Sequence, residues 1–318
     1  MNILLASSHD FVSRFIIETC IKKGYTLTLF GENECLSSLF PKTPIIYHVK
    51  HLDLKKFDVF IDLTNDNVEK TTKRCQELKP YVKQYVYLSD LSVYKSLGKE
   101  NIKETDELSP SSMKLSIEQE ITTSFPKKSL IIRAGELVGP YDQQEQLPFL
   151  LYRTLVGGEI LVGGREKRKI QLLDVRDLVD WMITMLEKQA TGTYHVTGNR
   201  IEMHDLLSLV AKITNSNASF IYADEKFLMD QQVKPWSELP FWIPEFYPVE
   251  KEYMYGLFSI NHTKALKKGL TLRPVEETVH DTFHWLREDG RHDFKIGLPL
   301  EKEFELIKEY KHKLCVSP

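Results

Sequence analysis

Short apolar runs alternate with helix-length amphipathic stretches along the first half of the chain, and this alternation restricts the fold more than any other feature. The runs with the length and composition of buried strands are residues 3–5, 26–30, 45–49, 59–63, 84–88 and 129–133, and a further sheet strand is expected in the second half at residues 193–197. Between them lie the helical patterns 11–22, 67–78, 112–123 and 175–187. Strands that alternate with helices form a parallel sheet covered on both faces, with right-handed crossovers. The sequence therefore predicts an α/β fold with a doubly wound parallel sheet.

The second half of the chain has a different character and predicts a smaller second domain. Two Gly-Gly pairs flank residues 159–162, which favours a small hairpin or a strand between turns. Residues 235–248 are dense in proline and aromatic residues, so we expect an ordered loop packed over apolar surface. Further helices are expected at 203–213, 278–287 and 301–311. The first domain is assigned residues 1–156 and about 167–200, and the smaller domain about 157–166 and 201–318.

The turn between the first strand and the first helix contains no glycine. In a dinucleotide-binding turn, glycines let the backbone approach a pyrophosphate at the helix N-terminus. Ser7, Asp10 and Ser13 stand where those three glycines would be. An Asp10 carboxylate about 5 Å from the pyrophosphate costs about 3 kcal/mol at an effective dielectric of about 20, and a side chain forced to positive φ costs roughly 1–2 kcal/mol more. Alternatively, Asp10 and Ser8 cap the helix that follows.

Composition excludes several classes of protein. The net charge of −3 argues against a nucleic-acid-binding protein. The four cysteines show neither metal-ligand spacing nor a Cys-x-x-Cys pair, so reduced thiols are expected. The histidines have no ligand spacing, and no metal is expected. The N-terminus enters a strand directly and no apolar run is long enough to span a bilayer, so we expect a soluble, cytoplasmic protein.

Several segments, in their order and spacing, resemble a known family. Besides the N-terminal strand-turn-helix they are residues 85–94 (YVYLSDLSVY), 133–140 (RAGELVGP), 171–178 (QLLDVRDL), 192–198 (GTYHVTG), and 269–274 (GLTLRP) with Trp285. Over nearly its whole length the chain resembles the extended short-chain dehydrogenases/reductases, the NAD-dependent epimerase/dehydratase group. The late segments, including residues 239–244, look most like a bacterial reductase-like branch. The resemblance implies a Rossmann-like sheet, NAD(H) as cofactor and a substrate-binding part built from the second half.

The resemblance also implies a catalytic Ser/Thr-Tyr-Lys set, of which only part is present. The Tyr-x-x-x-Lys motif falls on residues 110–114, where Lys114 is kept but Pro110 occupies the tyrosine position. Asp90 stands at the Ser/Thr position, with Ser89 beside it as a partial substitute. Lys114 either binds the cofactor ribose or forms an ion pair with Asp90. Tyr94 is a weak candidate for the missing acid/base.

The remaining site residues follow from the same resemblance. The expected cofactor contacts are Ser7, Ser8, His9, Asp10, Phe11, Val12, Glu32, Leu63 and Lys114. Glu32 would bind a ribose 2′-hydroxyl, which favours NAD over NADP, unless it is simply a surface acid. Asp53 is a weak match for an adenine contact. Substrate contacts are expected from Tyr141, Asp142, Arg153, Gln171 and Arg273. Arg153 and Arg273 would clamp an anion unless they are structural, and His195 is expected to be a satisfied core residue.

Two functions from different classes remain open at this stage. One is a catalytically impaired relative that binds a nucleotide or a protein partner, with NAD(H) binding weakened or lost. The other is an active NAD(P)-dependent reductase or epimerase that acts on a small hydroxyl- or carbonyl-bearing substrate with a non-standard catalytic set. An RNA-binding relative is disfavoured by the acidic balance. A homodimer is expected only by analogy, because many relatives dimerise through the two helices that follow the fourth and fifth strands.

Overall fold

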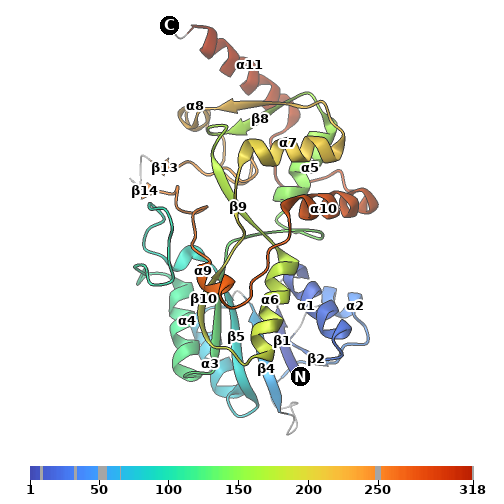
Figure 1. Ribbon diagram of the computed structural model, residues 1–318, viewed down its shortest axis with the longest axis vertical. Helices are drawn as coiled ribbons and strands as arrows, with labels where there is room; N and C mark the ends of the chain where they lie inside the picture. Colours follow the sequence, from blue (N-terminus) through green and yellow to red (C-terminus); the bar gives the residue numbers. More distant parts are fainter. Residues whose placement is uncertain (8–9, 32–33, 49–55, 65, 248–251, 317–318) are drawn as a thin grey trace.

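The computed structural model describes residues 1–7, 10–31, 34–48, 56–64, 66–247 and 252–316. Its centre is a seven-stranded parallel sheet (Figure 1). The strand order is β10 (Gly192–Val196), β6 (Ser129–Ala134), β5 (Val82–Ser89), β4 (Phe57–Leu63), β1 (Asn2–Ser7), β2 (Thr26–Phe30) and β3 (Ile45–Ile46). The expected α/β doubly wound fold is confirmed, and every expected strand of the first half is present.

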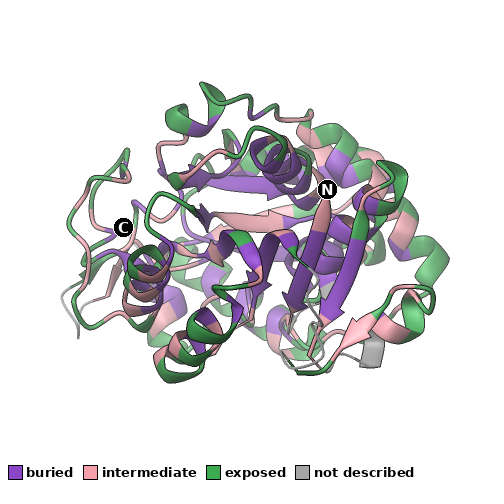
Figure 2. Ribbon diagram, turned by 90° about the horizontal axis from the view of Figure 1, so that it is seen from below, coloured by how far each residue is buried: buried purple, intermediate pink, exposed green. Residues whose placement is uncertain are grey.

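Two layers of helices cover the sheet. Helices α1 (Asp10–Lys22) and α6 (Val175–Glu187) share one apolar core with β1, β2 and β4. Helices α3 (Val68–Leu78) and α4 (Met113–Ser124) pack on the opposite face, and the short α2 (Glu34–Leu39) follows β2. Figure 2 shows burial concentrated on the central strands, while the outward helix faces are exposed. The helix expected at 67–78 begins at Val68, because Asn67 acts as its N-cap and accepts the N–H of Lys70 at 2.9 Å.

The second half builds smaller sheets and a separate helical layer. A three-stranded sheet contains β11 (Arg200–Glu202), β9 (Lys169–Asp174) and β7 (Glu136–Val138). The remaining helices are α5 (Gln146–Val156), α7 (Met203–Thr214), α8 (Glu225–Asp230), α9 (Thr263–Leu266), α10 (Val275–Asp289) and α11 (Leu300–Val316), with a 3-10 helix at Leu91–Val93. A two-residue pair, β13 (Phe246–Tyr247) and β14 (Glu252–Tyr253), completes the set. None of the helices in the described residues is long and apolar enough to cross a membrane.

Two expectations for this half are sharpened by the structure. The run at 159–162 is strand β8 (Glu159–Gly163), which pairs in parallel with β12 (Ser219–Ala223) and so is not half of a hairpin. The aromatic segment that begins at residue 235 is an ordered loop in its described part, because Phe241 and Trp242 are fully buried. Helix α5, placed in the first domain from sequence, packs with α7 and α10 in an apolar core of the second half.

Candidate functional site

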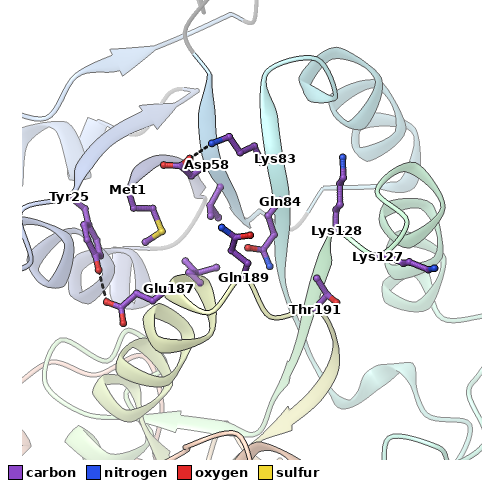
Figure 3. Close-up of a pocket in the computed structure, with 12 residues that line it drawn as sticks. Met1, Tyr25, Asp58, Lys83, Gln84, Lys127, Lys128, Glu187, Gln189 and Thr191 are labelled. Carbon is purple, nitrogen blue, oxygen red and sulfur yellow. Dashed lines mark hydrogen bonds and ion pairs between the residues drawn. The ribbon is translucent and has the colours of Figure 1, made fainter.

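The structure has a cavity at each end of the central sheet. The carboxyl-end cavity measures about 390 Å³ and is lined by Phe11, Val12, Leu63, Leu88, Ser89, Asp90, Lys114, Ala134, Gly135, Leu137, Gln143 and Gln144. The amino-end cavity is larger, about 620 Å³, and lies where the strands begin (Figure 3). Ligands of open α/β sheets bind outside the carboxyl ends of the strands. The smaller cavity is therefore the candidate functional site.

Half of the expected cofactor and catalytic contacts meet in the carboxyl-end cavity. Phe11 and Val12 come from the start of α1, Leu63 from the end of β4, and Ser89 from the end of β5. Asp90 and Lys114 complete this group. They converge because neighbouring parallel strands bring their carboxyl ends to one edge of the sheet. Leu88, Ala134 and Gly135 were not expected, although they stand at the ends of β5 and β6 and the same rule points to them. Leu137, in β7, was not expected either.

Lys114 reaches a tyrosine that the sequence did not single out. Its Nζ donates to the Tyr87 hydroxyl at 3.2 Å and lies 3.8 Å from a carboxylate oxygen of Asp90. Burial raises the pKa of Tyr87 above its usual value, so this hydroxyl stays protonated at neutral pH. Strand alternation could have pointed to Tyr87, because it shares a strand face with Ser89. The expected Lys114–Asp90 pairing is present, and Asp90 also accepts the N–H of Ser92 at 2.8 Å.

Ser89 presents an unsatisfied polar atom within the site. It is 3 % exposed, and its Oγ has no hydrogen-bond partner among the described residues. A buried hydroxyl without a partner is unusual, and a bound polar group would satisfy it. Around it, Phe11, Val12 and Leu137 supply apolar walls. Apolar walls with a few placed polar groups suit a flat heteroaromatic ring attached to a ribose, so the residues present fit the nicotinamide half of a dinucleotide.

The glycine-free turn is only partly described. Ser8, His9, Glu32 and Asp53 lie outside the described residues, and the side chain of Asp10 is not described either. The Ser13 hydroxyl donates to the Ser7 hydroxyl at 2.5 Å, which ties the end of β1 to the first turn of α1. These two hydroxyls thus link the strand and the helix at positions where glycines would pack closely.

A loop between residues 139 and 145 forms one wall of the site through Gln143 and Gln144. Tyr141 and Glu145 both have positive φ, 68° and 65°, a conformation that is rare for residues with side chains and persists only when the surroundings fix it. The guanidinium of Arg14 lies 3.6 Å from the centre of the Tyr141 ring. Glu145 accepts hydrogen bonds from Arg291 at 3.0 Å and from the N–H of Lys295 at 2.7 Å. Tyr141 therefore packs beside the site rather than lining it.

Two buried carboxyl groups lie next to this wall in the chain. Oε1 of Glu136 and Oδ2 of Asp142 are inaccessible and have no hydrogen-bond partner among the described residues. Burial raises the pKa of Glu136 to about 8, and the neighbouring Asp142 adds to the effect. Burial also raises the pKa of Asp142 to about 7, although it accepts the N–H of Gln144 at 2.8 Å. In both cases the cause is burial, which disfavours the charged form of a carboxyl group. Of the two, only Asp142 was among the expected site residues.

The structure does not bring Arg153, Gln171 or Arg273 into the carboxyl-end cavity. Arg153 is buried, and its Nε donates to Glu303 at 2.7 Å. Gln171 bridges backbone, donating to the carbonyl groups of Gly198 and Ile260, both at 3.0 Å. The Nε of Arg273 donates to Asp177 at 2.7 Å, in a separate cavity of about 380 Å³. The structural alternative that the sequence left open for both arginines fits these contacts.

Tyr94 and His195 belong to a buried polar network. Arg133 donates to the Tyr94 hydroxyl at 2.8 Å, and this hydroxyl lies 2.5 Å from Nε2 of His195. Nδ1 of His195 lies 2.9 Å from the carbonyl oxygen of Asn261. Burial raises the pKa of Tyr94 to about 12 and lowers the pKa of His195. Both ring nitrogens of His195 have partners, as expected for a satisfied core residue, and Tyr94 is committed to this network rather than to the cavity.

Residues 42–197, which include β4 to β6, α4 and β10, match the NAD dependent epimerase/dehydratase family. The resemblance of the chain to this family is thus confirmed over these residues. No curated protein sequence matches it. Pro110, at the family's tyrosine position, lies in the exposed turn before α4 and does not line the cavity.

Solved structures with the same fold include two enzymes determined with NAD. UDP-glucuronic acid 4-epimerase from Bacillus cereus is 14% identical, with a TM-score of 0.68, covering 92% of this chain and 100% of its own. dTDP-glucose 4,6-dehydratase from Bacillus anthracis is 16% identical, with a TM-score of 0.68, and the match covers 91% of this chain and 97% of that enzyme. UDP-glucose 4-epimerase from Thermotoga maritima, determined with UDP-glucose, is 16% identical, with a TM-score of 0.65. The match covers 92% of this chain and 100% of that enzyme. At these identities the likeness establishes the fold.

Proposed function

We propose that this protein, which resembles the NAD-dependent epimerase/dehydratase family, binds a nicotinamide dinucleotide in the carboxyl-end cavity and lacks tyrosine-based acid/base chemistry. The observation that carries the proposal is the lining of the cavity. It keeps Lys114 and the unpartnered Ser89 hydroxyl, whereas Pro110 offers no proton at the tyrosine position. A nicotinamide dinucleotide supplies hydride transfer when bound. The protein would therefore act as a nucleotide-responsive binding protein rather than as a reductase or epimerase.

Within this proposal each residue has a defined role. Phe11, Val12 and Leu137 would enclose the nicotinamide ring and exclude water. The Ser89 hydroxyl would hydrogen-bond to the carboxamide or the ribose. Lys114, held by Tyr87 and Asp90, would donate to the ribose hydroxyls. Among the described residues, no tyrosine lines the cavity, so a hydroxyl proton of a substrate would have no tyrosine there to receive it.

We expect the affinity to be lower than that of a glycine-rich site. The cost of Asp10 at the pyrophosphate, about 3 kcal/mol, corresponds to about two decades of dissociation constant. Neutral donors at the N-terminus of α1 remain available to the pyrophosphate. Binding in the range of about 0.1–1 mM is therefore expected for NAD or NADH.

Titration calorimetry with NAD, NADH, NADP and NADPH tests the proposal. NADH should bind the wild-type protein, and Asp10→Gly should bind it at least about tenfold more tightly because a like charge is removed. Lys114→Gln should weaken binding, whereas Lys212→Gln, an exposed lysine on α7, serves as the matched control. Absence of binding to both the wild-type protein and Asp10→Gly would contradict the proposed cofactor. Steady-state turnover of a carbonyl substrate by the wild-type protein would show instead that the site is an active, non-standard reductase or epimerase.

A further inference from the structure

The amino-end cavity lies at the opposite end of the sheet from the proposed nucleotide site. Its lining comes from residues just before, or within the first three positions of, β1, β2, β4, β5, β6 and β10 and from the end of α6. With a volume of about 620 Å³ it falls within the usual range for small-molecule sites. The role proposed for the carboxyl-end cavity makes no use of it. Its contents must therefore be argued from its own side chains.

The floor of this cavity is polar and partly fixed. Gln84 is buried, and its Nε2 donates to the carbonyl oxygen of Ala190 at 2.6 Å. In Figure 3 the carboxamide groups of Gln84 and Gln189 lie close together in the middle of the cavity, and Thr191 stands beside them. Amide and hydroxyl groups in this arrangement offer both donors and acceptors. They suit the hydroxyl groups of a polyol.

The charges of the lining favour an anion. Both carboxylates of the lining are already engaged, Asp58 by Lys83 at 2.7 Å and Glu187 by Lys23 at 2.7 Å. Lys127 and Lys128, at the rim, form no ion pair with any part of the chain that the structure describes. A lysine ammonium on its flexible stem can turn toward a ligand in the cavity and act as a point charge. The rim therefore carries two cations that can meet an anionic group.

The backbone of the lining is fixed by two hydrogen-bonded turns. Lys127 and Gln189 stand at the cavity with φ of 57° and 49°, in the left-handed region. Gln189 follows the end of α6, where the N–H of Ala190 donates to the carbonyl oxygen of Met185 at 2.9 Å. Lys127 lies in the turn that leads into β6, which the N–H of Lys128 closes by donating to the carbonyl oxygen of Phe125 at 3.0 Å. Both turns hold the residues of the polar floor and the cationic rim in place.

We propose that the amino-end cavity is a second small-molecule site that binds a phosphorylated polyol of sugar-phosphate size. The phosphate group meets Lys127 and Lys128. The hydroxyl groups meet Gln84, Gln189 and Thr191. This site is separate from the nucleotide cavity and does not depend on the function proposed for it.

Titration calorimetry of the full chain with glucose 6-phosphate, glucose and inorganic phosphate tests this site. Glucose 6-phosphate should bind more tightly than either fragment, because neither fragment makes both sets of contacts. In Lys127→Gln/Lys128→Gln the affinity for glucose 6-phosphate should fall at least about tenfold, and Lys212→Gln should leave it unchanged. Binding should weaken when salt is raised, since exposed charges are screened, and should persist when the protein is saturated with NADH.

Each other outcome overturns the proposal. No measurable binding of glucose 6-phosphate removes the site. If glucose binds as tightly as glucose 6-phosphate, the phosphate group and the two lysines contribute nothing. If inorganic phosphate binds as tightly as glucose 6-phosphate, the polar floor contributes nothing. Loss of binding in Lys114→Gln together with retention in the rim double variant would place the ligand in the carboxyl-end cavity instead. Absence of NADH binding, by contrast, would refute only the function proposed for that other cavity.

Discussion

At the scale of single residues, the chain buries ionisable side chains in two ways: as an ion pair, and as carboxyl groups with no cation beside them among the described residues. Arg153 and Glu303 are 8% and 5% exposed and form an ion pair, and the second oxygen of Glu303 accepts the N–H of Leu161 at 2.9 Å. Glu136 and Asp142 form no ion pair within the described part of the chain, and burial raises their pKa values. The first arrangement fixes structure, whereas the second makes the fold sensitive to pH.

The Arg153 pair gives a prediction that separates a structural arginine from a substrate clamp. Arg153→Met should lower the free energy of unfolding by about 3–5 kcal/mol, because it leaves the Glu303 carboxylate buried without its cation. The double variant with Glu303→Leu should recover part of this loss. Urea unfolding of the wild-type protein, Arg153→Met and the double variant measures these changes in the free energy of unfolding. An unchanged midpoint in Arg153→Met would restore the ligand-clamp interpretation.

Glu136 gives a pH prediction with a definite sign. Its pKa in the folded protein, about 8, exceeds its ordinary value, so between about pH 5 and pH 8 the folded state holds a proton that the unfolded state has lost. The stability contributed by this proton is present below the unfolded pKa and is lost as the pH rises through the folded pKa. Glu136→Gln should therefore be more stable than the wild-type protein at pH 8.5, by about 2 kcal/mol, and should show a flatter pH dependence.

Urea unfolding at pH 5.5 and pH 8.5 checks this difference, with exposed Glu305→Gln as the matched substitution. The Glu305 variant should follow the pH dependence of the wild-type protein. If Glu136→Gln follows it too, the buried carboxyl of Glu136 does not retain its proton at neutral pH.

At the scale of elements, the strand and helix pattern was predictable, and the pairing between distant segments was not. Apolar runs and helical periodicity located β1, β2, β4, β5 and β6 within a few residues. Parallel topology then explains why Leu63, Ser89 and Lys114 converge. The partner of β8 is β12, far along the chain, and no local pattern distinguishes that pairing from a hairpin. Long side chains such as Arg153 and Arg273 are the hardest to place, because their partners are also remote in sequence.

Close contact between β9 and Gly198, the second residue after β10, yields a prediction at this scale. A Cβ added at Gly198 would lie 1.7 Å from the carbonyl oxygen of Leu172, a backbone atom that cannot move aside cheaply. Gly198→Ala should therefore destabilise the fold by more than about 3 kcal/mol. Gly24→Ala is a control, because that site has a φ of 70° but open space around it, and it should cost only about 1–2 kcal/mol. Similar thermal midpoints for the two variants would contradict the close approach.

At the scale of the whole molecule, the sheet separates two sites of different chemistry. The carboxyl ends carry Ser89, Lys114 and apolar walls, which fit a nicotinamide group. The amino ends carry the polar floor and the cationic rim of the larger cavity. If cavity size alone decided where a ligand is placed, the larger cavity at the amino ends of the strands would be chosen. The topology of a parallel sheet favours the carboxyl end for the dinucleotide that we propose. In the same proposal, Pro110 at the tyrosine position separates binding there from the catalysis of the family.

The most direct test of this account is a crystal structure of the protein grown with NADH. We predict that electron density places the nicotinamide ring in the carboxyl-end cavity, against Phe11 and Leu137, with the ribose next to Lys114 and no tyrosine hydroxyl within hydrogen-bond distance of the ring. Density for the dinucleotide in the amino-end cavity, or a tyrosine hydroxyl brought to the nicotinamide, would contradict the central claim.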